Sequence, residues 1–438
     1  DACGYQPESE DSEGSPCTYE CRICPIEDLI AALPDEVTPD NSEDVRARLD
    51  EILALFGELT ADEQEQIDLS RCYELQEALD GANDPDPITE SVEYQEASWD
   101  GSQVTYESKT ETCTLVENSA EAVTWTAGWY AVSGTVTISE PITVTGEVHL
   151  ILVDGCTLNA EKGIVVTTGN SLTIYAQSGG TGTLMATGTV DGNNASAGIG
   201  GSTSSPNSGT ITIHGGVINA IGGCVGNAQR VAAGIGGGTG DTGGSGSNIT
   251  IYGGKVTAVS PKNNGGNGGA GIGGGGGNVG GSGSAIAIRS GTVQATGGDM
   301  GAGIGGGDGG EGSGNGTNIT ISGGTVTAIG GDYAAGIGGG GGYQNTYGGG
   351  CTGGTGSVTI NGGIVDASSP TDVYYANYKG APIGNGGNTT ATATVSKTNA
   401  IVFENGAGTV CGDVTLDGSY TVPGDYTLNI PVGASLSG

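Results

Sequence analysis

The chain has 438 residues, of which 90 are glycine and only 5% are aromatic. A globular domain of this length would need more large apolar side chains, so the composition excludes one ordinary hydrophobic core and favours a thin, stacked core. The net charge of −37 argues against binding to nucleic acid or to anionic membrane surfaces. The sequence holds no apolar run of 18 residues, so we expect no membrane insertion of this chain.

The first hundred residues carry most of the charge, with 29 acidic against four basic side chains. Residues 1–24 form an acidic, cysteine-containing segment. Residues 25–81 predict a small α-helical module, because Pro25 suits the first position of a helix and apolar residues then recur at helical spacing. We expect its last helix to begin at a capping box over residues 60–63 and to end near Gly81.

Ten cysteines, an even number, are typical of disulfide bonding in an oxidising compartment. The disulfide candidates are Cys3, Cys17, Cys21, Cys24 and Cys72. The first four could instead bind zinc, although a zinc ribbon normally uses two well-separated pairs, so we favour disulfides and predict no metal site. Cys72 is expected to pair back with Cys21 or Cys24, and Cys156 to be a free thiol in the core.

Residues 82–98 are interpreted as an acidic linker, and residues 99–438 as a β-domain. Within it, glycine-rich repeats cover residues 197–385, and each copy joins an AGIG element, a glycine-rich run and a pair of short strands. The strand pairs are ITIHGGVINA (211–220), ITIYGGKVTA (249–258), IAIRSGTVQA (286–295), ITISGGTVTA (319–328) and VTINGGIVDA (358–367).

Apolar residues alternate within each strand pair, as they do in strands that bury one face. A glycine pair divides the two strands in most copies, which predicts a corner with positive φ. The sequence therefore predicts a right-handed parallel β-helix with three strands per coil, in which each coil adds roughly 4.8 Å. We expect the glycine-rich runs to project as loops from one corner. The strand pattern still runs at Gly438, so we expect an uncapped end, a fragment, a processed form, or a subunit whose end a partner covers.

Signals for catalysis are weak, and we predict no catalytic residue and no cofactor. The chain has two histidines, and neither adjoins a nucleophile motif. His214 shares its corner position with Tyr252 and Arg289, and we interpret it as a variable surface position. Four acids could gather by stacking, but no basic residue accompanies them as a polysaccharide lyase would require. These acids are Asp299, Asp308, Glu311 and Asp332.

Tyrosines are the candidate ligand contacts. Tyr333, Tyr343 and Tyr347 lie in one glycine-rich run, and Tyr374, Tyr375 and Tyr378 lie in the next. Tyrosine offers flat amphipathic area that suits sugar rings or protein partners. The alternative is that these rings only cover the flank of the solenoid.

The segments WYAVSG, VHLILVDGCTLNAEKGIVV and AGIGGG followed by ITIxGGxVTA resemble repeat-rich β-helix surface proteins secreted by gut Firmicutes, which are often labelled carbohydrate-binding-domain proteins. CRICPIEDLIAALPDEVT with LTADEQEQIDLSRCYELQEAL resembles a helical module appended to such proteins. The resemblance implies an extracellular location on a bacterial cell surface, and it brings no defined ligand. Relatives tend to carry histidines near the N-terminal cysteines, where this chain has Tyr19, which speaks against a metal role.

The sequence thus favours a non-catalytic, extracellular β-solenoid with a structural or adhesive role. An open solenoid end presents unpaired backbone groups, so end-to-end self-association into fibres is one form of this role. A glycan-binding module is the alternative, and a polysaccharide lyase or hydrolase is a third candidate. The expected partners are other copies of the chain, glycans, or host and bacterial surface proteins.

Overall fold

A computed structural model describes residues 23–38, 41–82, 88–226, 230–263, 265–344, 350–371, 373–416 and 419–438. The chain divides into two compact units, residues 1–88 and 89–438. Cys3, Cys17, Cys21 and Tyr347 lie outside the described residues, so the choice between disulfides and zinc at the first three is not addressed there. The described residues contain no helix that is both long and apolar enough to cross a membrane.

The first unit is helical, as predicted. Its helices are α1 (Cys24–Ala31), α2 (Ser42–Gly57), α3 (Ala61–Gln64) and α4 (Ser70–Ala82). Pro25 stands in the first turn of α1, and the Glu63 carboxylate accepts a 2.8 Å hydrogen bond from the Thr60 backbone N–H at the start of α3. The prediction of one continuous last helix that begins at the capping box is wrong, because α3 and α4 are separate helices. Asp68 accepts a hydrogen bond from the Ser70 N–H, and the second of these helices begins there.

Cys72 was predicted to form a disulfide, and this is wrong. Its thiol is free and only 2% exposed. It faces the core of the helical module, where it packs with Leu49, Leu75 and Leu79. Cys113, Cys156, Cys224, Cys351 and Cys411 are also free thiols, as expected for Cys156. The described cysteines from residue 72 onward therefore form no disulfides, although the even number of cysteines suggested pairing.

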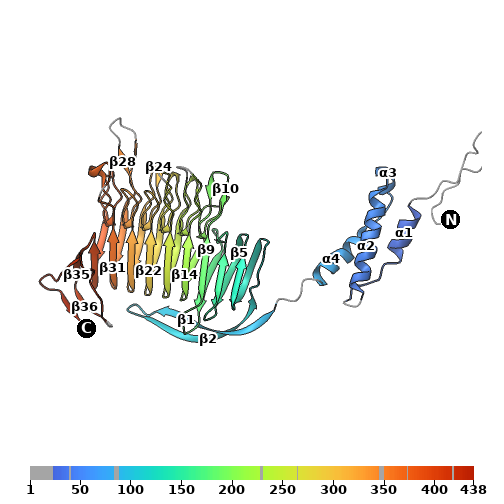
Figure 1. Cartoon of the computed structure of the whole chain (residues 1–438), viewed down its shortest axis with the longest axis horizontal. Helices are drawn as coiled ribbons and strands as arrows, with labels where there is room; N and C mark the ends of the chain where they lie inside the picture. Colours follow the sequence, from blue (N-terminus) through green and yellow to red (C-terminus); the bar gives the residue numbers. More distant parts are fainter. Residues whose placement is uncertain are drawn as a thin grey trace, which may run out of the picture. The chain divides into compact units, whose positions relative to one another are not determined.

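The second unit begins with a long hairpin where a linker was expected. Strands β1 (Thr89–Trp99) and β2 (Val104–Leu115) pair in antiparallel register from Thr89 opposite Thr114 to Trp99 opposite Val104. The acidic residues of β1 point to solvent, while Val92, Tyr94 and Ala97 are buried. Figure 1 shows the hairpin running along several coils of the solenoid.

The rest of this unit is a parallel β-helix with three strands per coil, as predicted. Two long strands open it, β3 (Val123–Val132) and β5 (Ile142–Leu152), which pair in parallel. The AGIG elements, preceded by β7, form the first column of short parallel strands. These are β7 (Ile164–Val165), β12 (Ile199–Gly200), β15 (Ile235–Gly236), β19 (Ile272–Gly273), β23 (Ile304–Gly305), β27 (Ile337–Gly338) and β32 (Ile383–Gly384).

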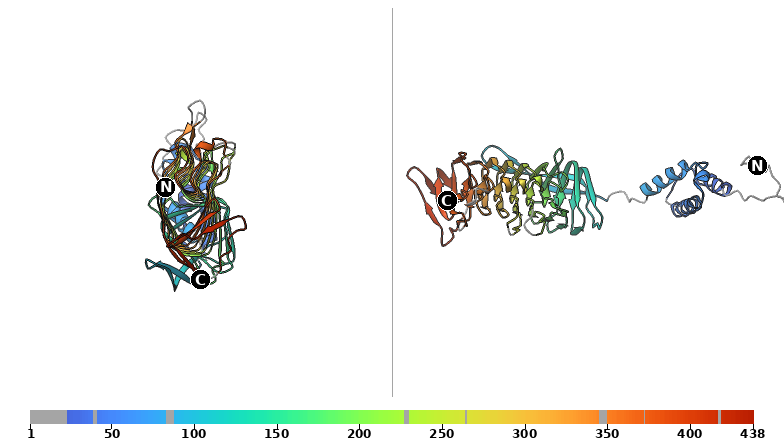
Figure 2. Two further views of the ribbon diagram at one scale, coloured as in Figure 1. Left: turned by 90° about the vertical axis from the view of Figure 1, so that its left-hand side faces the viewer. Right: turned by 90° about the horizontal axis from the view of Figure 1, so that it is seen from above.

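The two strands of each ITIxGGxVTA pair form the other two columns, and the coils lie one behind another along the stack (Figure 2). The middle column continues from β5 with β8 (Ser171–Ala176), β13 (Thr210–Ile213), β17 (Gly246–Ile251), β21 (Gly283–Ile288), β25 (Gly316–Ile321), β30 (Gly356–Ile360) and β33 (Thr394–Lys397). The third column contains β4 (Thr135–Ile138), β6 (Thr157–Ala160), β9 (Thr183–Thr187), β14 (Val217–Ile221), β18 (Lys255–Val259), β22 (Thr292–Thr296), β26 (Thr325–Ile329), β31 (Ile364–Ser368) and β34 (Ala400–Glu404).

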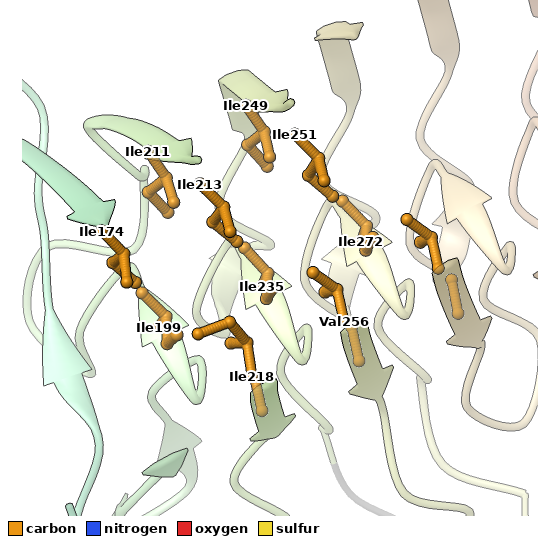
Figure 3. Packing of buried hydrophobic residues seen from close by; sticks show 14 of the residues in the cluster. Ile174, Ile199, Ile211, Ile213, Ile218, Ile235, Ile249, Ile251, Val256 and Ile272 are labelled. Atoms are coloured by element: carbon orange, nitrogen blue, oxygen red, sulfur yellow. The ribbon is translucent and has the colours of Figure 1, made fainter. Parts of the chain in front are cut away.

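The core of the solenoid is a stack of small aliphatic side chains. Within one coil, Ile235, Ile251 and Val256 come from the three columns and are fully buried. Figure 3 shows such side chains converging inside each coil and repeating in the next. Because the register places like residues opposite each other, as with Ile213 and Ile251, each coil presents the same packing surface to its neighbours.

The glycine pair between the middle and third columns makes the predicted corner. Its second glycine has positive φ in every repeat, from +80° to +88°, a region that glycine enters without steric cost. The second glycine of each AGIG element is also required. At Gly305, φ is +135° and an added Cβ would lie 1.9 Å from the carbonyl oxygen of Gly338 in the next coil.

The glycine-rich runs were expected to project as loops, and this is wrong. They stack above the strand columns as a second ordered layer, here called the glycine layer (Figure 1). It includes the parallel strands β16 (Gly240–Thr242), β20 (Gly277–Val279) and β24 (Gly309–Gly312). Backbone hydrogen bonds of 2.8–3.0 Å join successive runs in one series. The first N–H of the series, that of Gly238, donates to the Pro206 carbonyl. Each later N–H donates to the carbonyl of the previous glycine in the series, which consists of Gly238, Gly244, Gly275, Gly281, Gly307, Gly314, Gly340, Gly354 and Gly386.

Further segments pair with both ends of the third column, whereas the far end of the middle column is open among the described strands, since β33 pairs only with β30. At the start of the third column, the Ser119 N–H donates to the Thr137 carbonyl, and the Ser139 N–H donates to the Ser119 carbonyl. At its far end, β35 (Ala407–Cys411) turns back and pairs with β34 in antiparallel register. Phe403 is buried in the cluster that forms there. The remaining strands are β10 (Val190–Asp191), β11 (Asn194–Ala195), β28 (Tyr343–Gln344), β29 (Gly350–Cys351), β36 (Asp413–Thr415), β37 (Thr427–Asn429) and β38 (Ser435–Ser437).

Candidate functional site

Four of the predicted tyrosines meet in the structure. Tyr333 lies in the turn between β26 and β27, and Tyr343 begins β28. Tyr374 and Tyr375 precede the short 3-10 helix η1 (Ala376–Tyr378). We call these four residues the tyrosine cluster. Tyr378 ends η1 close by in the chain and is half-buried.

The rings of the tyrosine cluster form a stacked series. The centroids of Tyr333 and Tyr343 are 5.6 Å apart, and those of Tyr343 and Tyr375 are 5.4 Å apart with rings only 7° from parallel. Tyr374 stands at 90° to Tyr375, with 4.8 Å between centroids. Both stacked and edge-on contacts are favourable arrangements for aromatic rings, so the cluster is ordered without a ligand.

Exposure increases across the cluster from Tyr333 to Tyr374. Tyr333 is 8% exposed and has a φ of +60°, which is uncommon for a residue other than glycine. Its hydroxyl accepts a 3.1 Å hydrogen bond from the Tyr375 backbone N–H, which fixes the neighbouring turn. Tyr374 is 89% exposed. The cluster therefore anchors one fully presented ring on three rings that are partly or largely buried.

A buried carboxyl group lies below the cluster in the glycine layer. Asp308 is 2% exposed, and burial raises its pKa to about 7. Ser313 Oγ lies 3.1 Å from Asp308 Oδ1 and also contacts the carbonyl oxygen of Gly341. A hydroxyl has one hydrogen, and a carbonyl can only accept. Both contacts are satisfied together when Asp308 is a neutral acid that donates to Ser313, which agrees with its raised pKa.

Burial also sets the ionisation of the groups beside Asp308. Cys351 pairs with Tyr343 across β28 and β29, and burial, followed by the nearby Asp308, raises the pKa of its thiol. Burial and then Cys351 raise the pKa of the Tyr343 hydroxyl. Burial thus favours the neutral forms of the groups that support the cluster.

The four acids that could have gathered by stacking do not form one site. Asp308 is buried, whereas Glu311 and Asp332 are exposed. The Asp299 carboxylate instead accepts hydrogen bonds from the backbone N–H groups of Asn263 and Gly265. Among the described residues, no group of three or more His, Cys, Asp or Glu side chains has the geometry of a metal site.

His214 was interpreted as a surface position, and this is wrong. Its ring is 7% exposed and lies between the rings of Tyr175 and Tyr252, at centroid distances of 4.6 and 5.0 Å. Trp129 of β3 stacks on His149 of β5, with 4.2 Å between the ring centroids. These five rings form an aromatic ladder along the middle column.

The β1–β2 hairpin covers the aromatic ladder. Tyr94 packs on Tyr175, with 4.7 Å between centroids, and the Ala97 N–H donates a 2.9 Å hydrogen bond to His214 Nδ1. At the tip of the hairpin, Trp99 lies 5.2 Å from the guanidinium carbon of Arg289. Tyr175, His214 and Tyr252 stand at or beside successive corners, and this row of rings was the sequence feature from which a covering segment could have been predicted.

Comparison with known proteins identifies the repeat. A family model described as a beta helix repeat matches residues 211–239, 249–276, 286–308 and 319–341. The chain is a repeat-rich β-helix protein. In this β-helix protein, each matched segment runs from a middle-column strand through the third column to the next AGIG element. Searches of curated proteins and of solved structures gave no match, and the repeat model assigns neither a ligand nor a reaction.

Proposed function

We propose that this protein is an extracellular, non-catalytic adhesive solenoid that contacts carbohydrate through the tyrosine cluster. The observation that carries the proposal is the presentation of Tyr374, which is 89% exposed but held edge-on against Tyr375. A flat ring that is fixed before binding loses little conformational entropy when a sugar ring packs against it.

The surroundings of the tyrosine cluster support a neutral ligand with apolar faces. The net charge of −37 disfavours polyanionic ligands such as nucleic acid. Burial favours the neutral forms of Asp308 and Cys351 near the cluster. A sugar ring offers C–H groups to an aromatic face and hydroxyls to the tyrosine hydroxyl groups, so it fits this surface.

The contact is proposed to be non-catalytic because Asp308, the carboxyl group whose pKa is raised beside the rings, is shut away from solvent. A glycosidase needs two carboxyl groups that flank the scissile bond. Asp308 is 2% exposed and donates or accepts only within the glycine layer. The extracellular location on a bacterial cell surface rests on the resemblance to surface proteins of gut Firmicutes and on the acidic composition.

A glycan array followed by titration of the best neutral hit tests the proposal. Tyr374→Ala is expected to weaken binding about five- to thirtyfold, because ring stacking is worth roughly 1–2 kcal/mol. Tyr73→Ala is the matched control, because Tyr73 is 62% exposed on the helical module and its removal should change nothing. An array without hits, or a hit unaffected by Tyr374→Ala, would exclude this function. New reducing ends or unsaturated products would instead favour a hydrolase or lyase.

Self-association is a second candidate, and one observation favours it. Among the described strands, β33 pairs only with β30, so its other edge is unpaired, and Val395 on it is 37% exposed. The start of the third column is covered by Ser119, as described above. A head-to-tail fibre is therefore less favoured than a two-fold dimer in which the β33 edges of two copies pair.

The oligomeric state at increasing concentration, measured by analytical ultracentrifugation and by electron microscopy, tests this second candidate. The expected result is a dimer that Val395→Lys abolishes, because a charged residue protects an edge strand from pairing. Long filaments would favour the fibre instead, and monomers at all concentrations would rule out both.

A further inference from the structure

A hollow of about 340 Å³ lies between the β1–β2 hairpin and the corners of the solenoid. Gln95 and Tyr106 of the hairpin lie on one side of it, and Gln177 and Ser178 lie on the other. His214 and the corner glycines, including Gly215 and Gly254, complete the lining. This volume is near the lower end of the range for small-molecule sites, which suits a ligand of one or two rings.

The hollow arises from a change in corner length along the stack. Residues 177–182 join β8 to β9, whereas only residues 214–216 join β13 to β14 in the next coil. The longer corner stands out beyond the shorter ones and leaves a recess beside it. The corner glycines add no side chain to fill the recess, and the hairpin crosses over it. The recess is therefore a product of this fold and lies in coils that carry no part of the tyrosine cluster.

His214 supplies a fixed hydrogen-bond donor at the hollow. Its Nδ1 accepts from the Ala97 N–H, and burial lowers the pKa of the ring to about 4, so the ring is neutral and its proton is on Nε2. No protein group in the described part of the chain accepts from this Nε2–H, and Nε2 is not among the buried unpaired atoms. The ring is 7% exposed and stacked on both faces, so a donor that cannot turn away remains for a ligand.

The other polar groups of the hollow are neutral and have capacity left. Gln177 Oε1 accepts from the Asp154 N–H, which leaves its amide hydrogens. The Tyr106 hydroxyl donates to the Tyr252 carbonyl at 3.4 Å and keeps its acceptor lone pairs. Gln95 donates to Ser108 Oγ and keeps its carbonyl oxygen. No charged residue is among the described residues that line the hollow.

We propose that this hollow is a second binding site, which takes a single neutral sugar unit. Its donors and acceptors are mixed and uncharged, which matches the hydroxyl groups of a sugar and disfavours an ionic ligand. The ring of Tyr106 provides an apolar surface beside them. The site does not depend on the tyrosine cluster, and either can fail without the other.

The imidazole of His214 is its own reporter, because the chain has only two histidines. Protein labelled with ¹⁵N-histidine is titrated with D-glucose, D-galactose, D-mannose and N-acetyl-D-glucosamine. At least one of these sugars is expected to shift the Nε2–H resonance of His214 and to leave that of His149 in place. Ser178→Phe, an exposed substitution that fills the hollow, is expected to abolish the shift. Ser204→Phe, at an exposed serine of another turn, should preserve it.

Three results would overturn the proposal. The first is no shift with any of the four sugars, and the second is a shift that persists in Ser178→Phe while circular dichroism shows native fold. The third is a shift with D-galacturonate alone, which would mean an ionic ligand. Tyr374→Ala is expected to leave the His214 shift unchanged, and Ser178→Phe is expected to leave binding at the tyrosine cluster unchanged, so failure of one site is distinguishable from failure of the other.

Discussion

The strand columns and the glycine layer repeat with the same coils, but different groups hold them together. In the columns, buried side chains such as Ile272 and Ile304 stack on their counterparts in adjacent coils. In the glycine layer, backbone groups of successive runs hydrogen-bond directly, as Gly275 does to Gly244. Side-chain packing thus stabilises the strand columns, whereas the absence of side chains lets the backbones of the glycine layer come close enough to hydrogen-bond.

This difference determines which substitutions each region can accept. A column can lose a methyl group and relax around a cavity, at a cost that grows with cavity size. The glycine layer has no free space where successive runs bond to each other, because an added Cβ at Gly275 would lie 2.1 Å from the carbonyl oxygen of Gly238. Glycine is therefore a packing residue here as much as a flexible one, and the layer should respond to a single methyl more strongly than the core does.

Gly275→Ala is expected to have the largest effect. The added Cβ would lie 2.1 Å from the Gly238 carbonyl oxygen and 2.7 Å from that of Gly237, and backbone atoms cannot move aside as a flexible side chain can. We expect a loss of at least about 4 kcal/mol in the free energy of unfolding, or failure to fold. Denaturant unfolding measures it. Gly310→Ala is the control, because its nearest neighbour would be 3.9 Å away, and equal losses in both variants would contradict close packing of the layer.

Ile272→Ala tests the column in the same coil. Ile272 is fully buried, so the variant should lose about 2–5 kcal/mol in the free energy of unfolding. Val279→Ala, at a side chain that is 40% exposed in the glycine layer, should lose much less. A smaller loss for Ile272→Ala than for Val279→Ala would mean that the aliphatic stack is not the main source of stability in that coil.

Asp308→Asn should stabilise the glycine layer in a pH-dependent way. The pKa of Asp308 is about 7 in the folded chain and 3.8 ordinarily, so the folded state binds more protons between these values and stability falls as pH rises through them. Above pH 7, Asn should raise the free energy of unfolding by up to about 4 kcal/mol, and below pH 4 it should change little. Thermal unfolding across this range measures it, with exposed Asp332→Asn as control, and a pH-independent difference would contradict the assignment.

Ala285→Asn should give the smallest effect. Ala285 has a φ of +50°, whereas the equivalent positions in adjacent coils hold Asn248 and Asn318 at +58° and +52°. Asparagine tolerates this conformation better, so we expect a gain of about 1 kcal/mol in the free energy of unfolding. Ala287→Asn, two residues further along the same strand β21, should give no gain. A loss at Ala285 would indicate that the exposed methyl group has a packing role.

The strand columns could be predicted from the sequence because every coil solves the same packing problem. Alternation of residues such as Ile249, Thr250 and Ile251 shows which face is buried, and the recurrence of the pattern shows that the faces stack. The grouping of tyrosines in two adjacent glycine-rich runs likewise predicted residues that meet, since adjacent runs lie in adjacent coils. Which ring is presented to solvent depends on backbone turns such as that at Tyr333, and no residue pattern encodes it.

The hairpin and the glycine layer could not be predicted in the same way. In β1, the charges of Glu93 and Glu96 gave the segment a linker composition, although Val92 and Tyr94 alternate with exposed residues as in a strand. The glycine layer is held together by backbone hydrogen bonds. Because glycine has no side chain, a run of glycines contains no periodic pattern of apolar residues from which the layer could be predicted. The hollow beside His214 depends on the hairpin and on the lengths of the corners that it crosses, so it becomes visible only in the folded molecule.

Pro206 gives the hydrogen-bond series of the glycine layer a defined beginning. Each donor in the series bonds to an earlier residue, alternately in the preceding run and in its own run, and the first run accepts from Gly238 at Pro206. Proline has no backbone N–H, so this position needs no acceptor from an earlier coil. The hydrogen bonds of the series thus all run in one direction along the chain, and Pro206 ends the series at its N-terminal side. Copies of the repeat can be gained or lost after Pro206 without leaving a buried donor unpaired at that position, which makes the length of the array free to vary in evolution.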